Sequence, residues 1–271
     1  MTPQRVKALA LEIAVSSPAG SIAAFTGGAD RVELCVGLEL GGLTPSQGLI
    51  EAVVAESLPA HALIRCRPGD FVFDDDEIAL MEREVRTALR SGAAGVVIGA
   101  LDAYGSLDES AISRLVDVAL STHTEATITL HRAIDQATDP AAVIARLAGL
   151  GVQRVLTSGG AARAADGAAT LTRMVDASGD VQIMAGGGVS PADVPDLAAL
   201  GIDAVHLSAK QAAPRSGGSW IPLGAGTTSC DDDIHFVTNA GAVAAARAAI
   251  QSAGRPSRSP SAASYLNGEL P

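Results

Sequence analysis

Short apolar runs alternate with longer amphipathic segments along most of this chain. Such short runs are typical of buried parallel strands, and the longer segments are typical of helices packed over them. We predict eight strands, over residues 8–15, 31–35, 62–66, 95–98, 127–130, 154–157, 181–185 and 204–207. A helical segment follows each strand, and the last one lies near residues 237–252.

The order of these elements predicts a single-domain α/β protein, a (β/α)8 TIM barrel. Eight βα repeats indicate a parallel sheet, and a barrel of this kind needs about 250 of the 271 residues present. A glycine-led junction recurs before every second strand, at residues 28–34, 92–98, 151–157 and 201–207, which favours a closed barrel over a doubly wound open sheet. We expect the barrel to span residues 1–252 and residues 253–271, rich in Ser, Pro, Gly and Ala, to form a flexible tail.

Four prolines mark expected helix starts. Each of them follows a side chain that can cap a helix: Ser17, Thr44, Asp139 and Ser190. Such a side chain accepts a hydrogen bond from the first turn, and proline fits the first helical position because no N–H is needed there. Thr44 with Gln47 also fits a capping box.

Alternation of side chains along each strand assigns the two faces of the barrel wall. Most Val, Leu and Ile positions share one parity and should face the helices. The opposite parity directs five ionisable residues into the barrel: Glu12, Glu33, Arg65, His131 and His206. It also allows Arg67 to point inward.

Two explanations fit this polar interior. Glu12, Glu33 and Arg65 lie on adjacent strands and could form a buried ion network, which removes the cost of unpaired charges. The alternative is a functional site at the C-terminal mouth, where TIM-barrel enzymes carry their catalytic groups. A network does not account for His131 across the barrel, so we favour the site.

The loops after strands 6, 7 and 8 predict an anion-binding rim. Glycine-rich turns leave backbone N–H groups free to bind anions. The expected anion-binding residues are Ser158, Gly159, Gly186, Gly187, Gly188 and Ser208, with Lys210 beside them. After strand 5, Asp135 could orient Arg132 or the imidazole of His131.

Charge and cysteine content narrow the choice of partners. The formal net charge of −11 argues against nucleic acid and anionic membranes. The chain has no apolar run long enough for a membrane span and no signal-peptide pattern, and its three cysteines are too few for a disulfide framework. We therefore expect a cytoplasmic protein whose partner is a small anionic molecule or a metal ion.

Several motifs in register resemble the CutC family, known as copper homeostasis proteins. They occupy residues 28–35 (GADRVELC), 41–46 (GGLTPS), 64–71 (IRCRPGDF), 129–135 (TLHRAID), 155–159 (VLTSG) and 183–189 (IMAGGGV). The resemblance runs from Glu12 to about Ile250. It implies a cytosolic barrel, a homodimer or larger homo-oligomer, that handles copper.

The resemblance also implies a copper site built from cysteines near the ends of strands 1 and 2. Cys35 stands at the second position, but Ala14 stands at the first. Copper would then be bound by Cys35, His131 and His206, with Cys230 as a possible substitute ligand. Cu(I) prefers soft sulfur ligands, so one thiolate with imidazoles is a poorer site.

Two functions remain open from the sequence. One is copper binding in copper homeostasis. The other is an enzyme of isomerase or lyase type that acts on a small anionic or phosphorylated carbon compound. In it Glu33 would be the general base, His131 the general acid, and Arg65 would neutralise developing negative charge. A purely structural role would leave the polar interior unexplained.

Overall fold

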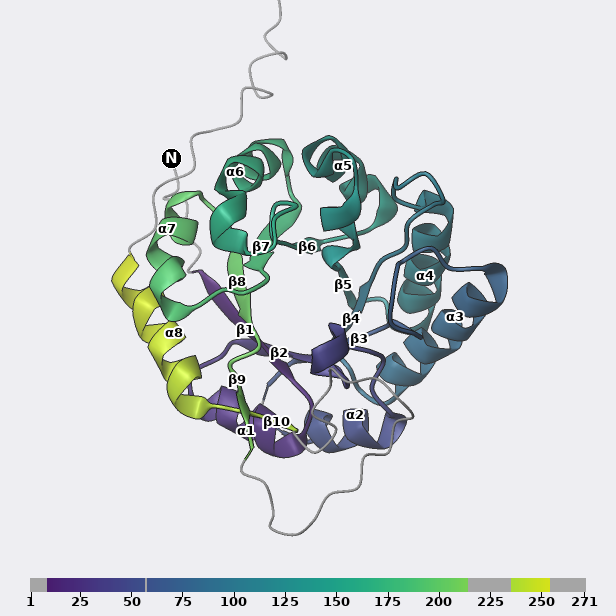
Figure 1. Ribbon diagram of the computed structural model, residues 1–271. Helices are drawn as coiled ribbons and strands as arrows, with labels where there is room; N and C mark the ends of the chain where they lie inside the picture. The colour runs from purple at the N-terminus through teal and green to yellow at the C-terminus, as the bar shows by residue number, and fades with distance from the viewer. Residues whose placement is uncertain (1–8, 57, 214–234, 254–271) are drawn as a thin grey trace, which may run out of the picture.

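Residues 9–56, 58–213 and 235–253 are described by the computed structural model, and they form a closed barrel (Figure 1). Its parallel strands follow chain order: β1 (Ala10–Val15), β2 (Arg31–Leu34), β3 (Ala60–Leu63), β4 (Gly95–Ile98), β5 (Thr127–Leu130), β6 (Arg154–Thr157), β7 (Gln182–Gly186) and β8 (Ala204–Leu207). Strand β1 pairs with both β2 and β8, which closes the ring. The predicted TIM barrel is confirmed, and the open-sheet alternative is wrong.

Helices form a ring around the strands (Figure 1). They are α1 (Pro18–Thr26), α2 (Gln47–Val54), α3 (Asp75–Arg90), α4 (Glu109–Thr122), α5 (Pro140–Leu147), α6 (Ala168–Ala177), α7 (Val194–Ala199) and α8 (Ala240–Ala253). The main core, rich in Leu, Ile and Val, lies between strands and helices. None of the described helices is long and apolar enough to cross a membrane.

Two predicted elements are displaced along the chain. Strand β3 begins and ends earlier than the predicted 62–66. It stops at Leu63, and the Arg65 N–H donates to Thr44 Oγ1 in a loop (2.8 Å) instead of continuing the strand pairing. Helix α8 begins after the predicted residue 237, because β10 (Phe236–Thr238) pairs with β9 (Lys210–Ala212) in a small antiparallel sheet. Ala253, the expected start of the tail, ends α8, and the rest of the tail lies outside the described residues.

Three of the four expected caps are present. Ser17 and Asp139 accept hydrogen bonds from the first turns of α1 and α5, and Ser190 forms a capping box with Asp193. The predicted Thr44 cap is wrong. Ser46 caps α2 instead, because the Thr44 hydroxyl donates to Glu84 and accepts the Arg65 N–H.

The predicted faces of the barrel wall are also observed. The outward positions Leu11, Val32 and Ile98 are completely buried against the helices, and the five predicted ionisable residues lie inside the barrel. Arg67 does not point inward. It forms ion pairs with Glu77 and Asp70 on the outer surface, because strand alternation no longer holds after β3 has ended.

Candidate functional site

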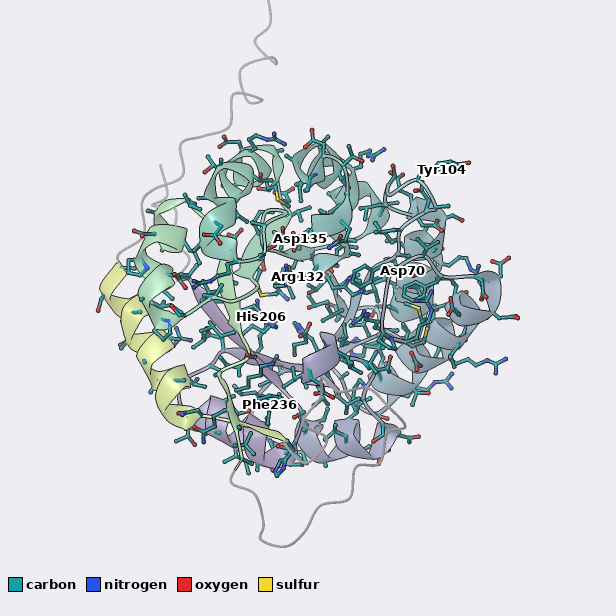
Figure 2. The ribbon with its side chains drawn as sticks, viewed as in Figure 1. Asp70, Tyr104, Arg132, Asp135, His206 and Phe236 are labelled. Atoms are coloured by element: carbon teal, nitrogen blue, oxygen red, sulfur yellow. The ribbon has the colours of Figure 1, made fainter. Side chains whose placement is uncertain are left out.

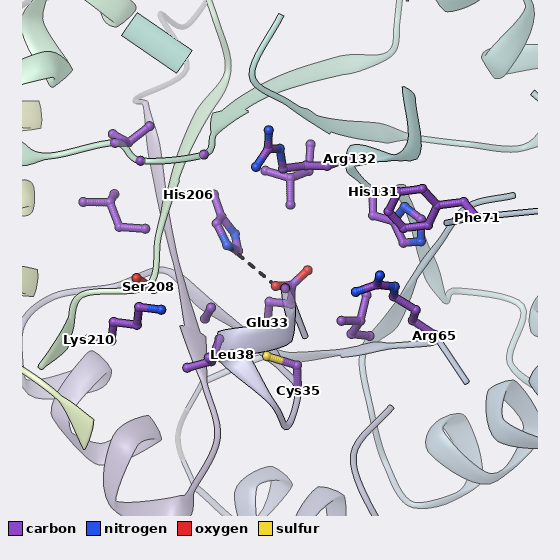
Figure 3. A pocket seen from close by; sticks show the side chains of 18 residues that line it. Glu33, Cys35, Leu38, Arg65, Phe71, His131, Arg132, His206, Ser208 and Lys210 are labelled. Atoms are coloured by element: carbon purple, nitrogen blue, oxygen red, sulfur yellow. Dashed lines mark ion pairs between the residues drawn. The ribbon is translucent and has the colours of Figure 1, made fainter. Parts of the chain in front are cut away.

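A cavity of about 380 Å³ opens at the C-terminal ends of the strands (Figure 3). Its ionisable lining comes from residues that end or follow β2, β3, β5 and β8: Glu33, Cys35, Arg65, His131, Arg132, His206 and Lys210. Gly187, Gly188 and Ser208 also line it. The position of the cavity matches the place where TIM-barrel enzymes hold their substrates.

The charge of this cavity is opposite to that of the whole chain. Among the described lining residues, Glu33 is the only carboxylate, whereas Arg65, Arg132 and Lys210 are cationic. The full chain carries a formal charge of −11. A positive cavity in an acidic protein concentrates small anions at the barrel mouth.

Glu33 is held in a state that can exchange a proton near neutral pH. Its side chain is buried, and this burial raises its pKa to about 7. The nearby imidazole of His206 opposes the shift, with Nε2 lying 3.6 Å from Glu33 Oε2 (dashed line in Figure 3). Such a carboxyl can act as an acid or as a base.

Glu12 lies beneath the cavity and does not line it. Its burial would raise its pKa, but hydrogen bonds from His206 and His61 and the charge of Arg31 outweigh burial and hold the pKa well below its usual value. Glu12 Oε1 lies 2.9 Å from Nδ1 of His206. Burial would lower the pKa of His206, but the carboxylates of Glu33 and Glu12 raise it. His206 therefore links an ionised Glu12 to a proton-exchanging Glu33.

The sequence prediction missed three buried residues below this site. Arg31 donates to Glu12, and Arg154 Nη1 donates to Thr129 Oγ1 (3.2 Å) and lies 3.4 Å from His61 Nδ1. The ion-network explanation therefore holds for Glu12, but with Arg31 rather than Arg65 as its partner. The same alternation, continued back toward the starts of β2, β3 and β6, places Arg31, His61 and Arg154 inside the barrel.

His131 is a neutral hydrogen-bond donor in this structure. Its Nδ1 accepts the Ala133 N–H (3.1 Å), which leaves the ring proton on Nε2. Burial, together with the charge of Arg65, lowers its pKa to about 3. The ring lies so close to Gly99 that an added Cβ there would be 2.5 Å from Cε1. The structure thus gives no support to the expected general-acid role near neutral pH.

Asp135 orients Arg132 from behind the cavity, which is one of the two roles expected for it. Its carboxylate accepts hydrogen bonds from Arg132 Nε (2.7 Å), Thr157 Oγ1 (2.5 Å) and the Ser158 amide (3.0 Å). Arg132 Nη2 also donates to Ser158 Oγ (2.9 Å). Asp135 and Ser158 therefore hold the guanidinium of Arg132 at the cavity edge, and Figure 2 shows Arg132 and Asp135 next to each other.

The expected anion cup is only partly assembled at the cavity. Gly187 and Gly188 adopt positive φ angles of 103° and 62° and line it together with Ser208. Ser158, Gly159 and Gly186 lie behind this surface; a Cβ on Gly186 would be 2.4 Å from Leu156 Cδ1. Whether these groups bind an anion stays a prediction.

The predicted metal-ligand set is not assembled. In the described part of the chain, the group of three or more His, Cys, Asp or Glu ligand atoms within 4.8 Å of one another is Glu12, Glu33 and His206, not Cys35, His131 and His206. Cys35 packs with Leu63 and Val97, and burial, followed by Glu33 and Glu39, raises the pKa of its thiol. Cys230 lies outside the described residues.

Comparison with known proteins agrees with the resemblance seen in the sequence. The CutC family profile matches residues 9–211. A CutC family protein from Xanthomonas campestris pv. campestris (strain B100) is 46% identical over 206 residues, which cover 74% of this chain and 84% of that protein. One from Vibrio vulnificus (strain YJ016) is 42% identical over 217 residues, covering 79% and 86%.

Solved structures agree with this assignment. A Streptococcus agalactiae structure, described as a candidate copper homeostasis protein CutC, is 25% identical with a TM-score of 0.69, covering 74% of this chain and 98% of that one. Thiamine phosphate pyrophosphorylase from Pyrococcus furiosus shares the fold alone, at 14% identity, a TM-score of 0.56 and coverage of 90% and 96%. This chain belongs to the CutC family.

Proposed function

We propose that the barrel mouth is an active site that binds a small anionic carbon compound and moves a proton through Glu33. This proposal rests on the contrast between a single carboxyl and the cationic side chains that line the same cavity. One buried carboxyl with a pKa of about 7 stands among the cationic side chains of Arg65, Arg132 and Lys210. We further propose that the protein acts in the cytoplasm as a homo-oligomer, as the family resemblance implies.

The geometry supports abstraction of a proton from a carbon beside a carbonyl, as in isomerase or lyase chemistry. Deprotonated Glu33 is the base, and His206, supported by Glu12, stabilises its carboxylate. Negative charge that develops on the substrate oxygen is balanced by Arg65 and by the N–H of neutral His131.

Glu33→Gln is expected to slow proton exchange at carbon by at least about 100-fold, because a positioned acid or base contributes roughly 100- to 10,000-fold. A panel of small oxo and hydroxy acids, with and without phosphate groups, would be incubated with the protein in D₂O. Loss of C–H signals would be followed by NMR. The exposed residue Glu39 on η1 (Leu38–Leu40) supplies the matched control, Glu39→Gln. Exchange that Glu33→Gln leaves unchanged, or a panel without any exchange, would contradict the proposal.

Copper homeostasis is the second candidate function. It is favoured by the description of the Streptococcus agalactiae relative and by the cluster of Glu12, Glu33 and His206. Carboxylate and imidazole donors suit Cu(II) or another divalent ion better than Cu(I). The cluster is not preformed for a metal, because Glu12 is bound by Arg31 and the pKa of His206 is raised.

If the protein binds copper through this cluster, Cu(II) retention should depend on Glu33 and not on Cys35. Protein without an affinity tag would be loaded with Cu(II), desalted and analysed for copper per chain. We expect retention by the wild type and by Cys35→Ser, and loss in Glu33→Gln. Wild-type protein that retains no copper would rule out the copper function, and equal retention by all three proteins would rule out this cluster.

A further inference from the structure

Two buried N–H groups at the cavity have no hydrogen-bond partner among the described residues: Arg65 Nε and His131 Nε2. Each of the other two Arg65 nitrogens already has an acceptor: Nη1 donates to the carbonyls of Leu40 (2.9 Å) and Gly42 (3.1 Å), and Nη2 donates one hydrogen to that of Gly69 (2.8 Å). Arg65 and His131 are 6% and 4% exposed. A buried donor without a partner costs folding free energy, so each such group calls for an explanation.

The two donors lie next to the same cavity and the same aromatic ring. Both residues line the cavity, and both contact the ring of Phe71: Arg65 Cζ lies 4.9 Å from its centroid, and the two ring centroids of Phe71 and His131 are 4.9 Å apart. Figure 3 shows these three side chains together on one side of the cavity, across from Lys210 and Ser208, with Glu33 and His206 between the two sides.

The number and type of donors define the group that they fit. Arg65 offers one positive charge and an N–H on Nε, the nitrogen without a partner, and neutral His131 offers the N–H of its unpartnered Nε2. One charge and two donors match one carboxylate with an adjacent carbonyl oxygen. A phosphate dianion carries more charge and three terminal oxygens, which two N–H groups do not satisfy. The flanking ring of Phe71 also favours a planar group.

We propose that Arg65 Nε and His131 Nε2 form a paired oxygen-anion site, covered by Phe71, that holds the carboxylate–carbonyl end of a 2-oxo acid. This inference rests on the proposed function and specifies its substrate class. When Glu33 takes a proton from the carbon next to the carbonyl, the electron pair of that C–H bond forms the C=C bond of an enolate, and the π pair of the carbonyl moves onto its oxygen. One of the two donors stabilises this enolate oxygen while the other holds the carboxylate.

Oxalate tests the site without any proton transfer, because it is planar, carries adjacent oxygens and has no C–H bond. The full chain, labelled with ¹⁵N at arginine and histidine side chains, would be titrated with oxalate and followed by NMR. We expect the Arg65 Nε–H and His131 Nε2–H signals to move downfield together as the site fills. No substitution is required for this measurement, so a variant that fails to fold does not affect it.

Two variants remove the donors one at a time. His131→Asn keeps an acceptor for the Ala133 N–H at the start of η2 (Arg132–Gln136) but removes the Nε2–H donor of the imidazole. Arg65→Lys keeps the charge and removes Nε–H. Each should weaken oxalate binding by about 10-fold or more, measured by calorimetry. His123→Asn on the exposed end of α4 and Arg67→Lys are the matched controls and should bind oxalate as the wild type does.

Unmoved side-chain signals, no oxalate binding, or wild-type affinity in both donor variants would overturn the paired site. Failure of the proposed function gives a different result. In that case oxalate still shifts both signals, and Glu33→Gln still binds it, while no compound exchanges a proton. Conversely, Glu33-dependent exchange without any effect of oxalate on the two donors would overturn this inference alone.

Discussion

Glu12→Ala is expected to lower the free energy of unfolding by about 3–5 kcal/mol, the usual result of removing one partner of a buried ion pair. Glu12 is completely buried, and its carboxylate accepts a hydrogen bond from Arg31 Nε. Removing it leaves Arg31 buried with the sulfur of Met184 (3.1 Å) as its only side-chain partner among the described residues. His206 and His61 lose the same neighbouring charge.

Urea unfolding at neutral pH measures this effect. Glu51→Ala is a suitable control, because Glu51 is exposed on α2 and its carboxylate accepts the side-chain amide of Gln47, four residues earlier on the same helix. Exposed substitutions of this kind change stability within about 0.5 kcal/mol. A Glu12→Ala protein that unfolds within about 1 kcal/mol of the wild type would show that the interior network does not depend on this carboxylate.

Glu33→Gln is expected to stabilise the protein at alkaline pH. Burial raises the pKa of Glu33 from 4.5 to about 7, so the folded state holds this proton more tightly than the unfolded chain does. The resulting stability is fully present below about pH 4.5 and is lost as pH rises through about 7, at roughly 1.4 kcal/mol per unit. The variant has no such titration, so near pH 8 it should exceed the wild type by on the order of 2–4 kcal/mol.

Urea unfolding of both proteins from about pH 5 to about pH 8 tests this expectation. The pKa of His206 is raised by Glu33 and by Glu12, so His206 also makes the stability of the wild type fall as pH rises, whereas the variant keeps only the part of that shift caused by Glu12. The two stability curves should therefore diverge with increasing pH. Parallel curves would mean that Glu33 titrates with an ordinary pKa. Such a gain in stability at the expense of activity is common for groups that serve function.

Much of the site could be predicted because strand alternation needs only local information. The parity of β2 and β8 placed Glu33 and His206 inside the barrel, and the structure brings Nε2 of His206 within 3.6 Å of Glu33. Alternation did not predict the orientation of side chains beyond the ends of the strands. Alternation allowed Arg67 to point inward, but β3 stops at Leu63 and the Arg65 N–H bonds to Thr44 in a loop.

Partners within the interior could not be predicted from alternation. The ion-network alternative would have paired Arg65 with the carboxylates of Glu12 and Glu33, but Arg65 donates to three loop carbonyls. Arg31 is the partner of Glu12, because the register of the barrel sets residues of β1 and β2 side by side at one depth. Depth and register are properties of the closed barrel and not of any single strand.

The sequence by itself determined the barrel, the order of its elements and the face that each strand residue occupies, because the periodicity of apolar and polar side chains depends only on consecutive residues. The tertiary structure alone decided which interior groups lie in the open cavity, which are paired and which hold a proton. Glu12 and Glu33 are the same residue type with the same parity. Yet the pKa of one is lowered well below the usual value and that of the other is raised to about 7. Burial and neighbouring charges cause this difference, and segments distant along the chain supply both.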